Sequence, residues 1–124
     1  MPDHVHMKNV LRRYVELFNA GDPAAVADLY ADDAVIEDPV GKPPVTGRAA
    51  IEEFYTAAMS SGVRLALVGE PRASYADRAA MAFTARLPGL LIEGIEVMTF
   101  DEDGRVARME AFWGPDDFGH PTGE

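Results

Sequence analysis

Asp38 is a carboxylate at a position where strand alternation places it among apolar side chains. Over residues 34–39 the alternation puts Asp38 on the same side as Ala34 and Ile36, and Pro39 follows it directly. An ionisable group among hydrocarbon costs free energy, so a chain that keeps one there either solvates it or uses its altered basicity. Asp38 is therefore a candidate base inside a pocket. The alternative is a solvated turn residue at a strand end.

Glu96 is the second candidate for chemistry. Alternation over residues 91–100 places its side chain on the face that also carries Ile92 and Met98. Apolar surroundings raise the pKa of a carboxyl group, so Glu96 is expected to stay protonated near neutral pH and to donate a hydrogen bond. Asp38 and Glu96 then have opposite roles. A register shift of one residue would instead send Glu96 to solvent and Glu93 inward.

Other side chains predicted on the buried faces could line a flat apolar slot. The periodicity groups Met81 with Phe83 on one strand, and Met109 with Trp113 on another. Phe54 and three tyrosines join the apolar sides of predicted helices; the tyrosines are Tyr14, Tyr30 and Tyr55. Each of these residues also has a simpler interpretation, because methionine and aromatic side chains at such spacing are ordinary components of a core.

The elements that must position these residues follow from periodicity and turn chemistry. A first helix is predicted over residues 5–20, a short second one begins at Pro23 and runs through Tyr30, and Thr46 caps a third. The pair Asp32 and Asp33 is interpreted as the solvated end of the second helix. Besides the strand that carries Asp38, strands are predicted over residues 63–69, 72–76, 79–87, 90–100 and 105–112. This order predicts an α+β fold in which a curved antiparallel sheet wraps three N-terminal helices around an apolar internal pocket.

Length and charge narrow the classes of function. The 124 residues predict one domain over 1–124, with an ordered core of about 5–114 and a tail over 115–124. The net charge of -10 opposes binding to nucleic acid or to anionic membranes. An apolar small molecule is the better partner, because an interior pocket can bind it while the acidic surface keeps the protein soluble.

The chain has no cysteine and no recognisable cofactor or metal motif. Its start lacks the basic and apolar segments of a secretory signal, and no apolar run approaches the roughly 20 residues that span a bilayer, so a cytoplasmic location without membrane contact is expected. The histidines are His4, His6 and His120, near the ends, and the first two are expected to be disordered. Catalysis, if present, must come from side chains without cofactor or metal.

Taken together, the short motifs of this chain have a recognisable order. The motifs are Arg13-Tyr14-Val15-Glu16-Leu17, Gly21-Asp22, Leu29-Tyr30-Ala31-Asp32-Asp33-Ala34, Glu37-Asp38-Pro39, Phe54-Tyr55 and Ile95-Glu96-Val97-Met98. From Tyr14 to Trp113 the sequence resembles bacterial ketosteroid isomerase, the steroid Δ5-isomerase. The resemblance implies the cone-shaped α+β fold shared with nuclear transport factor 2, the cystatin-like proteins and the SnoaL-like polyketide cyclases. It also implies a homodimer with one apolar pocket in each subunit.

Carried over by position, the resemblance implies roles for five residues. Asp38 would move a proton from C4 to C6 of a 3-oxo-Δ5-steroid, and Tyr14 would donate a hydrogen bond to the C3 oxygen. Tyr55 and Tyr30 match the tyrosines that extend the hydrogen-bond chain behind Tyr14. Glu96 occupies the position of the second donor. The division between an ionised base and a protonated acid is the known pattern of ketosteroid isomerases, so here it is taken from the family.

Glu96 departs from that family, which has an aspartic acid at this position. The extra methylene moves the donor by about an ångström, and a displacement of that order can cost about a hundredfold in rate. There are two alternatives. In the first, the backbone or the substrate adjusts to the longer acid. In the second, the pocket acts on another enone, or binds a ligand without converting it. We favour the first, because Asp38 and the tyrosines remain and a mere binding site needs no base. The alternatives are a steroid- or polyketide-binding protein, a SnoaL-like cyclase or dehydratase, and a protein-interaction domain.

Overall fold

The computed structural model describes residues 2–120, and their fold is α+β as predicted. The elements in chain order are α1 (His4–Asn19), α2 (Pro23–Ala27), β1 (Tyr30–Glu37), β2 (Val45–Thr46), α3 (Arg48–Ser60), β3 (Arg64–Ala73), β4 (Arg78–Leu87), β5 (Leu90–Phe100), β6 (Val106–Phe112), the 3-10 helix η1 (Pro115–Asp117) and β7 (Phe118–Gly119). The three α-helices lie in the first half of the chain, and most of the sheet lies in the second.

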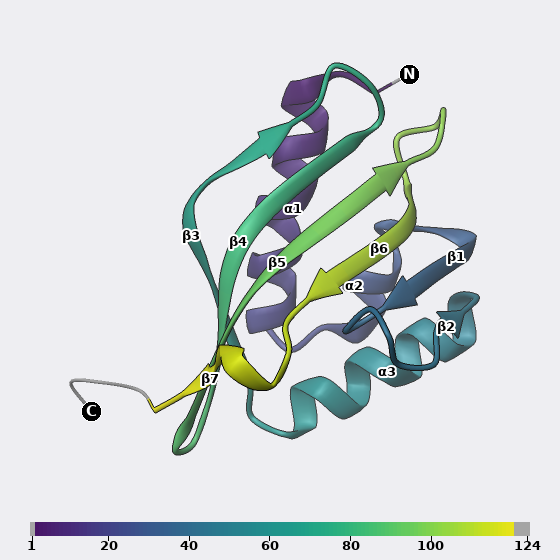
Figure 1. Ribbon diagram of the computed structural model, residues 1–124. Coiled ribbons are helices and arrows are strands. Elements are labelled where there is room, and N and C mark those ends of the chain that lie inside the picture. The colour runs from purple at the N-terminus through teal and green to yellow at the C-terminus, as the bar shows by residue number, and fades with distance from the viewer. Residues whose placement is uncertain (1, 121–124) are drawn as a thin grey trace.

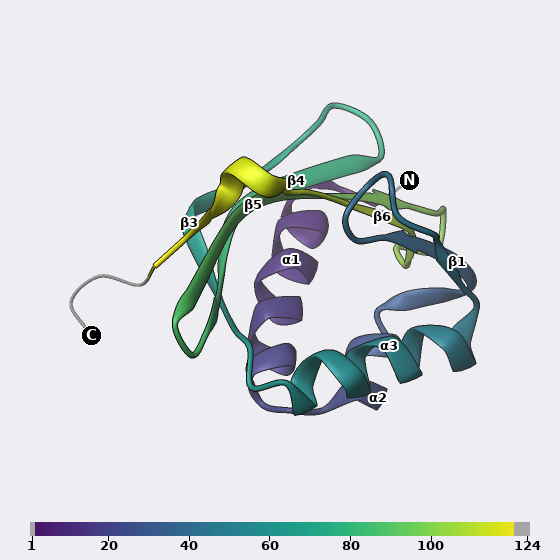
Figure 2. The same ribbon diagram turned by 60° about the horizontal axis from the view of Figure 1, so that its bottom comes forward.

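The strands form one curved sheet in the order β2-β1-β6-β5-β4-β3, with β7 added to β5. All neighbouring pairs are antiparallel except β1 and β6, which run parallel. Helix α1 packs on the inner side of β3 and β4, while α3 packs on β1 and β2 and contacts α2 (Figure 1). In Figure 2 the sheet curves around α1, and α3 closes the opposite side. This arrangement is the expected cone.

Helix α1 is capped at its start and anchored to the sheet at its end. Its N-cap residue Asp3 accepts a hydrogen bond from the backbone N–H of His6 at 2.8 Å. At its other end, the Asn19 amide donates to the carbonyl oxygen of Leu65 at 2.8 Å and accepts from the N–H of Leu65 at 2.9 Å. Between these ends a stripe at three- and four-residue spacing is buried, and it includes Tyr14. The position of Tyr14 is therefore set by the anchoring of the whole helix.

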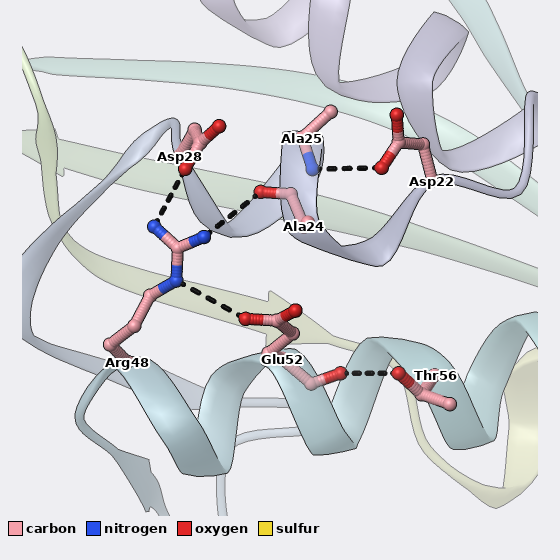
Figure 3. Close-up of polar contacts among 7 residues, drawn as sticks. All are labelled: Asp22, Ala24, Ala25, Asp28, Arg48, Glu52 and Thr56. Atoms are coloured by element: carbon pink, nitrogen blue, oxygen red, sulfur yellow. Dashed lines mark hydrogen bonds and ion pairs between the residues drawn. The ribbon is translucent and has the colours of Figure 1, made fainter.

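Helix α3, which carries Phe54 and Tyr55, is tied to α2 by Arg48 (Figure 3). The Arg48 guanidinium donates to Asp28 Oδ1 at 2.7 Å and to the carbonyl oxygen of Ala24 at 3.3 Å. Its Nε also reaches Glu52 one turn along α3, at 3.4 Å. The carbonyl oxygen of Ala24 also accepts the N–H of Asp28 at 3.0 Å, so Arg48 is a second donor to it. The positive charge of Arg48 near the C-terminal end of α2 complements the helix dipole.

Two details of the first half differ from the prediction. The second helix ends at Ala27, and Tyr30 is the first residue of β1, where it pairs with Val106. The N–H of Val106 donates to the carbonyl oxygen of Leu29 at 2.9 Å, so sheet pairing stops the helix earlier than local propensity suggests. Asp32 and Asp33 are exposed residues within β1, at an irregularity in its register with β6, and not the end of a helix.

The second half also contains corrections. The two strands predicted over 63–69 and 72–76 form a single strand, β3, with a register shift between Val68 and Arg72. Gly69 adopts φ +77° there, which glycine tolerates, so the chain bulges without leaving the sheet. Residues 115–119, expected to be a tail, form η1 and β7 instead, whereas 121–124 lie outside the described residues.

The N-terminal histidines are ordered, contrary to expectation. His4 and His6 belong to α1, and the His6 ring lies 2.8 Å from the carbonyl oxygen of Gly104 through Nε2. The same ring packs edge-on against Phe100, with centroids 6.1 Å apart. Residues near a chain end are ordered when such tertiary contacts hold them.

Candidate active site

Asp38 and Glu96 line the same cavity, of about 280 Å³, enclosed by the sheet, α1 and α3. Tyr14 and Tyr55 are also part of its lining, and the predicted apolar residues Phe54, Phe83 and Trp113 form walls. The cavity volume lies near the lower end for small-molecule sites. Further lining residues that the sequence analysis did not single out include Phe18, Leu65 and Ile92.

Met81 and Met109 do not line this cavity, although both were predicted to. Each faces the inner side of the sheet, as alternation requires, but Met81 is 2% exposed and Met109 is completely buried in the core. Met81 pairs across β4 and β5 with Glu96, and Met109 pairs across β5 and β6 with Met98. Strand periodicity predicted the correct face, but it cannot tell how far along that face the cavity extends.

Asp38 follows β1 directly and is partly buried, with its carboxylate bound by Trp113. The indole Nε1–H donates to Asp38 Oδ1 at 2.8 Å. Burial raises the pKa of Asp38 above its usual range, and the hydrogen bond from Trp113 opposes that rise. The indole thus stabilises the ionised form that a base requires. Strand spacing predicted Trp113 only as a wall of the slot, and its hydrogen bond to Asp38 was not predicted.

Replacement of Trp113 by phenylalanine is expected to raise the pKa of Asp38, because the indole N–H stabilises only the carboxylate form. A neutral hydrogen bond contributes about 0.5–1.5 kcal/mol net, so the acidic limb of the pH profile of kcat/KM should move upward by roughly half a unit to one unit. The profile of the variant, measured against that of the wild type, checks this. An unchanged acidic limb would contradict a role for Trp113 in the ionisation of Asp38.

Glu96 is the deeply buried acid of the pair, at 2% exposure, while Glu93 is exposed. Of the two registers considered for this strand, the one that turns Glu96 inward is present. Burial, and next the charge of Asp38, raise the pKa of Glu96 well above its usual range, and the neighbouring Tyr14 hydroxyl lowers it by a smaller amount. Its Oε2 has no hydrogen-bond partner among the described residues. The cavity wall thus contains a buried carboxyl group with an unpartnered oxygen, and its surroundings favour the protonated form.

The raised pKa of Glu96 makes folding stability depend on pH. Below the pKa of the unfolded chain, near 4.3, the group is neutral in both states and has no effect; above it only the unfolded chain ionises, so stability falls as pH rises. Glu96→Gln removes this loss of stability, because glutamine does not ionise. Each unit by which folding raises the pKa of Glu96 corresponds to about 1.4 kcal/mol in the free energy of unfolding. We expect the variant to melt at a higher temperature than the wild type at pH 7, with the difference vanishing toward pH 4. Equal melting temperatures at both pH values would show that Glu96 ionises in the folded protein.

The three tyrosines form a hydrogen-bond chain that ends at the cavity. The Tyr55 hydroxyl lies 2.6 Å from that of Tyr30 and donates to that of Tyr14 at 3.2 Å. Since Tyr55 has one proton and gives it to Tyr14, Tyr30 must donate to Tyr55, and the proton of Tyr14 is left for another acceptor. Burial raises the pKa of Tyr14 well above its usual value, so its hydroxyl stays protonated. Tyr30 lies behind Tyr55, outside the cavity lining.

No cluster of three or more potential metal ligands occurs within residues 2–120. In the same part of the chain, each helix is too short or too polar to cross a bilayer. The chemistry that the described site offers is proton transfer. A carboxyl group with an adjacent N–H donor, a second carboxyl group whose pKa is raised, and a phenol converge on one apolar space.

Residues 11–109 match the model of a protein family described as the SnoaL-like domain. The chain belongs to the SnoaL-like family. In solved structures the same fold occurs in SalBIII, described as an epoxide hydrolase/cyclase-like enzyme in pyran ring formation of the polyether salinomycin. That chain superposes with a TM-score of 0.80 and 29% identity, over 93% of this chain and 95% of the other.

Two curated relatives define the place of the chain within this family. A steroid Δ-isomerase of Nocardioides simplex is 44% identical over 115 residues, which cover 90% of this chain and 92% of the relative. Epoxide hydrolase LasB of Streptomyces lasalocidi is 30% identical over 94% of this chain but only 44% of its own length. The predicted membership of the ketosteroid isomerase group, in the SnoaL-like fold, is confirmed.

Proposed function

We propose that this protein is an enzyme that isomerises 3-oxo-Δ5-steroids to 3-oxo-Δ4-steroids. The observation that carries the proposal is the convergence of an ionisable base, Asp38, with two buried hydrogen-bond donors, Tyr14 and Glu96, on one apolar cavity. The 44% identity to a steroid Δ-isomerase along nearly the whole of both chains supports the same reaction. The substrate is a small apolar molecule, and the reaction needs no cofactor.

In the proposed mechanism the Asp38 carboxylate removes a proton from C4, next to the C3 carbonyl group. The electron pair of the broken C–H bond forms the C3–C4 double bond of a dienolate, and the negative charge moves to the C3 oxygen. Protonated Asp38 then returns the proton to C6, which leaves the double bond between C4 and C5 in conjugation with the ketone. The number of protons and electrons is unchanged, so one carboxyl group suffices as base and then acid.

Tyr14 and protonated Glu96 are proposed to donate hydrogen bonds to the C3 oxygen. Charge on that oxygen grows from substrate to dienolate, so donors already in place stabilise the transition state more than the ground state. Neither donor has to be charged, and burial raises the pKa of both groups, which favours their protonated forms. The unpartnered Oε2 of Glu96 is consistent with a group whose partner is the substrate.

The reaction is tested by following the absorbance of the conjugated enone with 5-androstene-3,17-dione as substrate. We expect turnover well above that in buffer, and the enone should be identified as the Δ4 product by chromatography. Circular dichroism of the same sample establishes that the protein is folded. Folded protein without turnover above buffer would remove the proposal; bound but unconverted steroid would then identify a binding protein.

A second candidate function is that of an epoxide-opening cyclase or hydrolase. The observation that favours it is the similarity to LasB and SalBIII, both described by epoxide chemistry. An acid that protonates an epoxide oxygen and a base that deprotonates a hydroxyl group would suit that reaction as well. The isomerase relative is more similar and matches over 92% of its own length, so isomerisation is the main proposal. Product analysis with a hydroxy-epoxide as substrate separates the two.

A homodimer is part of the proposal, through the outer face of the sheet. Val68, Ala82, Ile95 and Phe112 pair in one row across four strands. Three of them are large and exposed, with Val68 at 54%, Ile95 at 51% and Phe112 at 47%. A contiguous apolar row of this kind is typical of an interface, and a second copy is the occupant that the resemblance implies. Sedimentation of the wild type and of Ile95→Lys tests the proposed dimer, and a wild-type monomer would contradict it.

The cytoplasmic location of the protein stays a prediction.

A further inference from the structure

Gly94 is the one inward-facing position of β5 near the cavity that has no side chain. It lies two residues before Glu96 on the same face, and it pairs directly with Phe83 across β4 and β5. Its φ lies outside the left-handed region, so the turn geometry that usually explains a glycine does not apply. A glycine inside a strand with ordinary dihedral angles indicates close approach of another group.

The close group is the ring of Phe83. An ideal Cβ on Gly94 would lie 2.9 Å from two carbons of that ring, Cε1 and Cζ, and 3.1 Å from the carbonyl oxygen of Phe112. Non-bonded carbons prefer about 3.5–4.0 Å, so a side chain at 94 would require the ring to move by about half an ångström or more. The ring of Phe83 thus rests on the backbone of β5, in a recess that only glycine leaves open.

This recess matters for the substrate because Phe83 is a wall of the catalytic cavity. The inward pair that follows Phe83 and Gly94 on these strands is Met81 and Glu96, so the recess adjoins the position of the proposed donor. The core behind the ring is close-packed, and the cavity is the free space available to a displaced ring. A side chain at position 94 would therefore narrow the cavity.

We propose that Gly94 is a specificity-determining residue, which sets the width of the cavity by letting the Phe83 ring lie back against β5. This inference rests on the proposed function. A steroid carries methyl groups that stand off one face of its rings, whereas a flat bicyclic phenol such as 2-naphthol has none. The cavity width that Gly94 allows is therefore needed for the steroid and not for 2-naphthol. Both molecules present an oxygen to the same proposed donors, Tyr14 and Glu96.

The test compares Gly94→Ala with the wild type in KM and kcat for 5-androstene-3,17-dione and in the inhibition constant of 2-naphthol. Misfit of about one methyl group in an apolar pocket costs roughly 10-fold or more, so KM for the steroid should rise about tenfold. The narrower cavity should weaken binding of the substrate and of the transition state equally, so kcat should change little. The affinity for 2-naphthol should be retained. Phe83→Leu in the Gly94→Ala background should restore KM, because the shorter side chain clears the new Cβ.

Gly119→Ala is the matched control, since a Cβ at that position meets nothing within 4 Å. An unchanged steroid KM in Gly94→Ala, or an equal loss of steroid and 2-naphthol affinity, would overturn the inference. If Gly94→Ala does not fold, the double variant Gly94→Ala with Phe83→Leu decides. If the double variant does not fold either, glycine is required because of the nearby Phe112 carbonyl group and not because of the Phe83 ring, which would also overturn the inference. A wild type without steroid turnover would instead remove the proposed function, so the two failures are distinguishable.

Discussion

Asp38→Asn is expected to lower kcat for steroid isomerisation by about 10²–10⁴-fold, the range that general acid–base catalysis contributes. The amide cannot accept the C4 proton, while its carbonyl oxygen can still accept the hydrogen bond from Trp113. Affinity for a phenolic steroid such as equilenin should be kept or improved, because the neutral amide resembles the protonated base of the intermediate. Enone absorbance gives kcat, and fluorescence titration gives the affinity.

The matched control for this variant is Asp33→Asn, which makes the same chemical change at an exposed position of β1. It should leave both kcat and affinity unchanged. A parallel loss of turnover and affinity in Asp38→Asn would indicate that Asp38 holds the structure of the site and does not act as the base.

Tyr14→Phe is expected to lower kcat by about 10²–10³-fold, the usual cost of removing one oxyanion donor. The phenyl ring fills the same space, so the apolar packing of α1 is preserved, but the C3 oxygen loses a donor and the Tyr55 hydroxyl loses its acceptor. Since the hydrogen bond strengthens as charge develops, KM should change much less than kcat.

Two further tyrosine variants show whether the loss comes from the donor itself. Tyr75 is fully exposed, so Tyr75→Phe should have wild-type activity. Tyr30→Phe removes a hydroxyl that acts only through Tyr55, and it should cost less than Tyr14→Phe. If Tyr14→Phe retains kcat, Glu96 alone stabilises the dienolate and the tyrosine chain is structural.

The inward placement of the two acids was predictable because strand alternation is a local property. Asp38 and Glu96 both face the cavity, as the period of two indicated. The order Tyr30, Tyr55, Tyr14 of the hydroxyl chain was available only from the family resemblance. It depends on how β1, α3 and α1 pack, and no local pattern contains that information.

Three features of the site that were not predicted depend on long-range packing. The Trp113 hydrogen bond joins residues 75 positions apart; the available signal was that a tryptophan beside a pocket needs an acceptor for its N–H. Tyr30 was assigned to a helix because its pairing partner, Val106, lies far along the chain. The burial of Met81 and Met109 depends on where the core ends and the cavity begins, which the period of a strand does not reveal.

The parallel pairing of β1 with β6 has a consequence for the order in which this molecule is assembled. A parallel pair cannot be closed by a short turn, and here residues 38–105, more than half of the chain, lie between its two members. The Asp38 carboxylate and the Trp113 indole meet only when β6 pairs with β1. Closing this long loop costs conformational entropy, and the contacts that offset the cost form only once β6 is paired. The site should therefore become able to transfer protons together with global folding and not before it.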